Sequence, residues 1–195
     1  MIRDKKIVQK TVATKQQWQQ LSSEVVYENP WIRVDHDTVI TPGGCEGIYG
    51  CVHFKNHAVG ILAIDDSGWT WLVQQTRYPH SCMTWEIPEG GSPAEEACLD
   101  SAKRELVEEA GLEATQWSEW LHLQLSNSVT DELATIYLAQ KLSKTHTSHE
   151  DTEDISVKHL PLKEAIKMVH SGEIVDAMSV ASLLKAACDS RFIIF

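Results

Sequence analysis

Residues 90–112 of the chain read GGSPAEEACLDSAKRELVEEAGL, and this stretch decides how the rest of the sequence is interpreted. Apolar residues recur at helical spacing between Glu95 and Ala110, so we predict a helix over this range. The apolar stripe consists of Leu99, Ala102, Leu106 and Ala110. Ser92 and Pro93 stand where an N-cap and a first-turn residue belong, and Gly111 stands where a helix ends.

Three carboxylates share one face of this predicted helix. Glu105, Glu108 and Glu109 are spaced at i, i+3 and i+4, on a face beside the apolar stripe and distinct from it. Like charges at these spacings destabilise a helix by about 0.2–0.5 kcal/mol per pair, so a solvated helix more often alternates them with lysine. Carboxylate oxygens are ligands for hard divalent cations. The pattern favours a metal site, and the alternative is an ordinary acidic surface helix.

The remaining pattern predicts a mixed α/β (α+β) chain with two parts. Residues 1–56 form a strand-rich extension, in which the turn Pro42-Gly43-Gly44 joins two strands of a small β-meander, and residues 57–195 form the main domain. Residues 1–20 are polar and are expected as a loose arm, or as a short helix around residues 16–21. The predicted strands are 24–27, 31–40, 48–55, 58–64, 69–74, 85–87, 117–125, 135–139 and 155–160, and the later predicted helices are 162–170 and 176–188.

Composition restricts the classes of partner and compartment. The chain has 195 residues and 43% hydrophobic residues, enough for one ordinary domain with a core. Its net charge of −11 repels polyphosphate backbones, so nucleic acid is not an expected partner. The five cysteines show no CxxC pattern and are expected as free thiols in a reducing cytosol. With no signal peptide and no apolar run of about 20 residues, we expect a soluble cytoplasmic protein without a membrane partner.

The whole 90–112 stretch resembles the Nudix box, with every fixed position filled by the expected residue type. The fixed positions are Gly90, Glu96, Arg104, Glu105, Leu106, Glu108, Glu109, Gly111 and Leu112. The segments WEIPEGG at 85–91, QQTRYP at 74–79 and EDI at 153–155 are similar to the ADP-ribose pyrophosphatase branch, as is GEIVDA at 172–177. The resemblance implies a Nudix fold, a mixed β core sandwiched between helices. It also implies Mg²⁺-dependent cleavage, with Mn²⁺ able to substitute, of the diphosphate linkage in a nucleoside diphosphate sugar such as ADP-ribose.

The resemblance also implies roles for the box residues. The expected metal ligands are Glu105, Glu108, Glu109 and the carbonyl of Gly90, where the missing side chain lets the backbone come close. Glu108 and Glu109 are the catalytic candidates within the box, and Glu89 is a weaker candidate ligand. Glu96 and Arg104 are expected to orient the box, Arg104 by holding a carboxylate in place behind the metal.

Expected substrate contacts lie on both sides of the box. Arg77 can bind a phosphate through two hydrogen bonds, and the alternative is a surface salt bridge. Trp85 can stack on a base, and the alternative is ordinary core packing. Glu86, in the similar segment before the box, and Asn127, in the loop after it, complete these contacts.

An acidic loop at residues 148–154 is the expected source of the general base. Similar enzymes often take the base from a mobile loop at this place, since the box carboxylates are committed to metal. Glu150 and Asp151 are the candidates, while Glu153 is expected to be structural because it abuts the next strand. The alternative is a solvated charge run.

One departure from the branch bears on which substrate is expected. Members that hydrolyse ADP-ribose usually carry a proline some fifteen residues after the box, and this chain has none between Leu112 and Leu160. The departure favours the wider class of nucleoside diphosphate sugars over ADP-ribose itself. Three alternative functions are a non-catalytic sensor on the same fold, a hydrolase of other nucleoside di- or triphosphates, and an isoprenoid diphosphate isomerase. The strand-rich extension resembles a pairing element, so we expect a homodimer.

Overall fold

The structure is a computed structural model that describes residues 17–146 and 155–192. The chain divides into two compact units, Met1–Val52 and His53–Phe195, and each is described by itself. The candidate general bases Glu150 and Asp151, and the neighbouring Glu153, lie outside the described residues. Among the described helices, none is long and apolar enough to cross a membrane.

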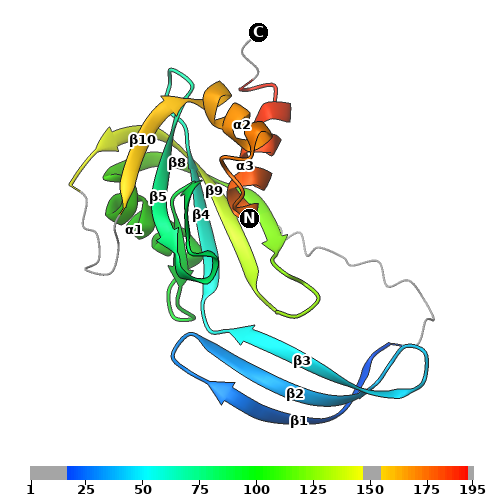
Figure 1. Cartoon of the computed structure of the whole chain (residues 1–195). Helices are drawn as coiled ribbons and strands as arrows, with labels where there is room; N and C mark the ends of the chain where they lie inside the picture. Colours follow the sequence, from blue (N-terminus) through cyan, green and yellow to red (C-terminus); the bar gives the residue numbers. More distant parts are fainter. Residues whose placement is uncertain (1–16, 147–154, 193–195) are drawn as a thin grey trace, which may run out of the picture. The chain divides into compact units, whose positions relative to one another are not determined.

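The first unit is a three-stranded sheet in the order β1-β2-β3 (Figure 1). Its strands are β1 (Gln19–Glu28), β2 (Ile32–Ile40) and β3 (Glu46–Phe54). The predicted meander is therefore present, but β1 begins where a loose arm or short helix was expected. The reason is pairing with β2, which places Gln19 opposite Ile40 and which local sequence does not reveal.

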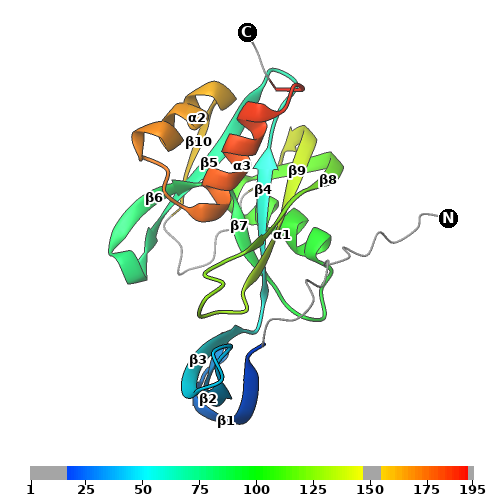
Figure 2. The same cartoon turned by 90° about the vertical axis from the view of Figure 1, so that its right-hand side faces the viewer.

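The second unit holds two sheets between helices, as predicted for the fold class. One sheet has the order β7-β4-β9-β8 and the other β10-β5-β6. Figures 1 and 2 show α1 on one side of the strands and α2 with α3 on the other. The elements are β4 (His57–Ala63), β5 (Trp69–Arg77), the 3₁₀ turn η1 (Tyr78–His80), β6 (Cys82–Glu86), β7 (Glu89–Ser92), α1 (Cys98–Ala110), β8 (Leu112–Gln124), β9 (Leu133–Lys144), β10 (Ser156–Pro161), α2 (Leu162–Ser171) and α3 (Ala177–Cys188).

Strand β4 lies at the centre of the packing because both of its faces are apolar. Alternate residues of a strand point to opposite faces, so one set packs under α1 and the other under α2 and α3. The α1 side buries Val59, Ile61 and Ala63 of β4 with Ala102, Leu106 and Ala110 of the helix. The opposite side buries Leu62 and Ile64 with Met168, Met178 and Leu183. The apolar stripe predicted for α1 is thus the surface through which it packs.

The two ends of α1 differ in how well the local pattern predicted them. Gly111 ends the helix in the left-handed conformation (φ 62°), as predicted. The predicted start is wrong, because α1 begins at Cys98 with Ala97 at the cap position and no side-chain cap. Ser92 is instead the last residue of β7, and its hydroxyl accepts a hydrogen bond from the Ser101 hydroxyl at 2.8 Å. Ser92 therefore fastens the box loop to the helix rather than capping it.

The glycine pair before the helix lies in a strand rather than in a loop. β7 pairs antiparallel with β4, with Glu89 opposite Gly60, Gly90 opposite Val59 and Ser92 opposite His57. Four residues with two glycines carry almost no strand signal, and only the presence of β4 alongside provides their partners. This pairing fixes the backbone that approaches the carboxylates of α1.

Candidate active site

The three box carboxylates lie in different environments although they share one helix face. The Glu109 residue is 2% exposed, whereas the Glu108 side chain is 29% exposed and that of Glu105 is 13% exposed. The face that carries them is therefore not uniformly exposed, because Glu109 is buried although it lies off the apolar stripe. The helix turns Glu109 toward β5 and β7, which cover it, and leaves Glu108 partly exposed.

Arg104 holds the two more exposed carboxylates together. Its Nη1 donates to Glu105 Oε1 at 2.8 Å and to Glu108 Oε2 at 2.9 Å, and its Nη2 donates to the Gly91 carbonyl at 3.1 Å. Nη2 also lies 3.4 Å from Glu96 Oε2. Burial alone would lower the pKa of Arg104, but the carboxylates of Glu105 and Glu108 raise it. The guanidinium joins Glu96 to the carboxylates and ties both to the strand before the helix.

Gly90 leaves room for the carboxylate of Glu105. A Cβ added at Gly90 would lie 2.2 Å from Cδ and 2.3 Å from Oε1 of Glu105. Its φ is not in the left-handed region, so the position needs glycine for space and not for backbone conformation. The structure thus brings Gly90 and Glu105, both expected ligands, into direct contact. Within residues 17–146 and 155–192, no group of three or more His, Cys, Asp or Glu side chains is already gathered as a metal site.

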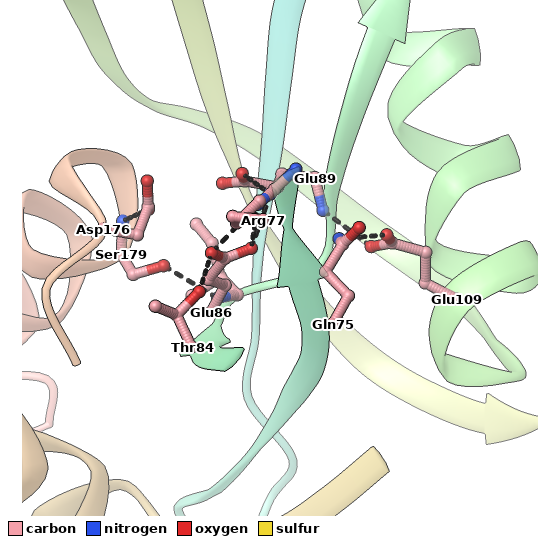
Figure 3. Close-up of polar contacts among 9 residues, drawn as sticks. Gln75, Arg77, Thr84, Glu86, Glu89, Glu109, Asp176 and Ser179 are labelled. Atoms are coloured by element: carbon pink, nitrogen blue, oxygen red, sulfur yellow. Dashed lines mark hydrogen bonds and ion pairs between the residues drawn. The ribbon is translucent and has the colours of Figure 1, made fainter. Parts of the chain in front are cut away.

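Glu109 is held from two strands (Figure 3). Its Oε2 accepts a hydrogen bond from the Glu89 peptide N–H at 2.8 Å, and its Oε1 accepts one from Gln75 Nε2 at 3.5 Å. Gln75, on β5, belongs to the QQTRYP segment that resembles the branch, but no role was predicted for it, because only the folding of β5 beside α1 brings it to Glu109. The buried carboxylate is therefore oriented by the β5 side chain and by the β7 backbone.

The guanidinium of Arg77 is paired with two carboxylates, those of Glu86 and Glu89. Its Nε donates to both oxygens of Glu86 at 3.1 and 3.0 Å, and its Nη2 contacts Glu86 and Glu89. Glu86 is 2% exposed and also accepts a hydrogen bond from the Thr84 hydroxyl. Burial alone would lower the pKa of Arg77, and the two carboxylates raise it. Among the described residues Nη1 makes no hydrogen bond, and the Arg77 side chain is 34% exposed, so this edge of the guanidinium can donate to another ligand.

The other two expected substrate contacts lie away from the box. Trp85 follows Thr84 and precedes Glu86 on β6, so it points to the opposite face of the strand, where it packs against the core under α2 and α3. The ammonium of Lys158 lies 3.9 Å from its ring centroid. Asn127 is exposed in the turn between β8 and β9. The structure does not bring either residue to the carboxylates of α1.

A hollow of about 310 Å³ lies beside the box loop, and the sequence analysis had no signal for it. Its walls include Asn56, His57, Ser92, Glu96 and Glu132. His57 Nε2 is 2.9 Å from the Thr135 hydroxyl, which is also 3.2 Å from His122 Nδ1. Burial, and then the charge of His122, lower the pKa of His57 below 6.5. The hollow is therefore bordered by a histidine whose protonation the fold disfavours.

This arrangement predicts a pH dependence of stability. Because the pKa of His57 is lower in the folded chain than its ordinary value of 6.5, the unfolded chain binds the proton more readily. The contribution of His57 is thus fully present above that value and is lost as the pH falls through the lowered pKa. We expect the His57→Gln variant to lose less unfolding free energy than the wild type between pH 7.5 and 5, as measured by urea unfolding. The exposed His80→Gln is the control, and parallel curves for wild type and His57→Gln would contradict the prediction.

With this geometry described, comparison with known proteins gives two family matches. Residues 18–52 match the family model described as the nucleoside diphosphate sugar hydrolase N-terminal domain. Residues 55–182 match the NUDIX domain, which covers more than half of the chain. The boundary between the matches lies close to the division of the structure at Val52 and His53.

Individual relatives give a consistent result. An ADP-ribose pyrophosphatase of Mycobacterium tuberculosis (strain H37Rv) is 33% identical over 168 residues, 84% of this chain and 80% of the relative. An ADP-ribose pyrophosphatase of Bacillus subtilis (strain 168) is 33% identical over 128 residues, 65% of this chain and 69% of the relative. A solved ADP compounds hydrolase superposes with a TM-score of 0.79 at 20% identity, covering 88% of this chain and 92% of that one. At that identity the structural likeness shows the fold.

Proposed function

The chain belongs to the Nudix family of pyrophosphohydrolases, and on this basis we propose that it hydrolyses the diphosphate bridge of a nucleoside diphosphate sugar, ADP-ribose or a close relative. The observation that carries the substrate class is the 33% identity to ADP-ribose pyrophosphatases over most of the chain. The absence of a proline after the box favours the wider sugar class, so the proposal includes relatives of ADP-ribose. Water adds to one phosphorus, the bridging P–O bond breaks, and two monophosphates form, with the two protons of the water released when both products are dianions.

The donor set suits Mg²⁺, with Mn²⁺ as its substitute. Hard divalent cations prefer carboxylate and carbonyl oxygens, and the Gly90 backbone lies directly against the Glu105 carboxylate. In our proposal Glu105, Glu108, Glu109 and the Gly90 carbonyl hold the metal. When bound, the ion neutralises phosphate charge and acidifies water.

Other residues of the chain position the carboxylates, bind the phosphate and supply the general base in this proposal. Arg104 and Glu96 keep the carboxylates of α1 next to β7, and the Nη1 edge of Arg77 offers hydrogen bonds to a phosphate. Glu150 and Asp151 remain our candidates for the general base. A carboxylate on a separate loop can accept a proton while the box carboxylates hold metal.

A substrate panel tests the proposal. With purified protein and Mg²⁺ we expect ADP-ribose or another nucleoside diphosphate sugar to be cleaved with kcat/KM of at least about 10⁴ M⁻¹s⁻¹, the lower end for enzymes on their own substrates. ADP-ribose would give AMP and ribose 5-phosphate, which chromatography separates. Faster cleavage of nucleoside triphosphates would show that these, and not nucleoside diphosphate sugars, are the substrate class. Tight binding of a nucleotide without turnover would favour the non-catalytic sensor.

We further infer a homodimer in which a second copy covers the first unit. The unit leaves large apolar side chains in solvent, including Trp31 in the turn between β1 and β2 at 68% exposure and Ile48 of β3 at 71%. Exposed apolar area of this kind marks an interaction surface, and two-fold dimers are the commonest assemblies. Analytical ultracentrifugation at micromolar concentration is expected to give about twice the chain mass of 21.9 kDa. A species of single-chain mass would contradict the inference.

A further inference from the structure

We propose that Glu89 is a positioning residue, whose ion pair with Arg77 fixes the backbone of residues 88–90 against the carboxylate of Glu109. The inference rests on the proposed function in one respect, namely that Glu109 helps to hold a divalent ion. It assigns to the Glu89 side chain a role that the spacing of the box does not indicate.

The first step is the anchoring of Arg77. Its Nε and Nη2 both contact Glu86, which is buried and receives a further hydrogen bond from the Thr84 hydroxyl. Arg77 and Glu86 belong to the paired strands β5 and β6, so the guanidinium is attached to a hairpin and not to a free loop. Figure 3 shows Arg77 between Glu86 and Glu89. A side chain held in this way can define the place of its other partner.

Glu89 is bound through its side chain and through its backbone. Its carboxylate contacts Arg77 Nη2, while its peptide N–H donates to Glu109 Oε2 at 2.8 Å. A single residue therefore connects the anchored guanidinium to the buried carboxylate of α1. If the ion pair is lost, the backbone of Glu89 keeps its pairing with β4 but loses its restraint from β5, so the N–H that donates to Glu109 is held less firmly.

The third step is that the neighbouring backbone is already held by the core. The carbonyl of Pro88 accepts from the Ile61 N–H at 2.8 Å, and the Ile87 N–H donates to the Ser179 hydroxyl at 2.8 Å. These bonds hold the segment from β4 and α3, and the Arg77–Glu89 pair adds a restraint from β5. The site is thus held from three elements, with Gln75 of β5 contacting Glu109 directly.

The charge balance supports a role other than plain stability. The Glu89 side chain is 13% exposed, and Arg77 is the cation that contacts it. Glu89 Oε2 is buried and has no hydrogen-bond partner among the described residues. Burying charged groups with incomplete pairing is unfavourable compared with apolar packing. The buried Arg77–Glu89 pair is therefore better explained by a positioning role, because it holds the Glu89 N–H that donates to Glu109.

The test measures metal binding without substrate. Glu89→Gln keeps the size and the peptide N–H but loses the charge, and we expect its Kd for Mn²⁺, followed by electron paramagnetic resonance, to rise about 10-fold. At saturating Mn²⁺ its KM for substrate should stay within about 2-fold of wild type, since the change acts through Glu109 and not on the substrate. Glu95→Gln, an exposed residue of the box loop, makes the same charge change and should bind Mn²⁺ like wild type.

Two further variants separate positioning from general damage. Arg77→Gln leaves the Glu89 carboxylate in place and is expected to raise the Kd about as much as Glu89→Gln, whereas Arg77→Lys, which keeps a cation, should raise it less; an unchanged Kd in Arg77→Gln would make Glu89 a direct ligand and overturn the inference. In Arg77→Gln/Glu89→Gln the effects should not add, because both changes break one contact. Circular dichroism checks folding. If folded Glu89→Gln binds Mn²⁺ like wild type, or if only KM rises, the inference is overturned. Failure of the wild type to cleave any diphosphate would refute the proposed function, while the Mn²⁺ comparison would still decide the role of Glu89.

Discussion

Replacing Glu108 by Gln is expected to lower kcat by at least about 100-fold, the scale of losing a main electrostatic element of an active site. Glu108 is the most exposed of the three box carboxylates, and the side-chain contact it makes is with Arg104. Its replacement therefore removes a charge from the site while the buried core of α1 stays intact. Glu109 is a poorer choice for this test, because its carboxylate is buried and accepts the Glu89 N–H, so its replacement mixes chemistry with stability.

The measurement is steady-state hydrolysis of the substrate found by the panel, with Mg²⁺ titrated for each variant. Glu113→Gln, on the exposed edge of β8, makes the same change outside the box and should retain wild-type kcat. EDTA should abolish turnover of the wild type, and added Mg²⁺ or Mn²⁺ should restore it. Near-full activity in a folded Glu108→Gln protein would remove Glu108 from the metal site.

Gly90→Ala is expected to reduce kcat/KM by about 100-fold with little loss of stability, since a misplacement of about 1 Å in an active site can cost this much. The new Cβ would lie 2.2 Å from the carboxyl carbon of Glu105, which must move. Because that carboxylate ends a flexible side chain, the helix need not shift. The φ of Gly90 is accessible to alanine, so no backbone strain is added.

Gly60→Ala on the neighbouring strand provides the contrast. Its Cβ would lie 3.1 Å from Ile87 Cδ1 and 3.2 Å from Met178 Cε, in the core under α3. Overpacking of this kind costs about 1–3 kcal/mol, so we expect a lower free energy of unfolding with more than half of kcat retained. Chemical denaturation and steady-state kinetics on both variants decide the matter. A Gly90→Ala enzyme that loses stability but keeps its kcat/KM would show that Gly90 serves the fold and not the site.

Local sequence predicted the features that depend on local geometry. The apolar stripe of α1 follows from its period of 3.6 residues, and the end at Gly111 follows from the low cost of positive φ at glycine. The start of the same helix was wrong, because Ser92 satisfies the local rule for a cap while its backbone is taken by pairing with His57 of β4. A local signal is overridden when a distant strand offers a partner.

The sequence by itself determined that a helix carries Glu105, Glu108 and Glu109 on one face after a glycine pair, since spacing along a helix sets which residues are neighbours. Only the tertiary structure decided what covers that face. β5 and β7 bury Glu109 and leave Glu108 partly exposed, and the β5–β6 hairpin places Arg77 on Glu86 and Glu89 while turning Trp85 to the other side. These contacts join residues that are not spaced at a helix or strand repeat in the sequence. They therefore form only when the strands have paired, and local sequence does not predict them.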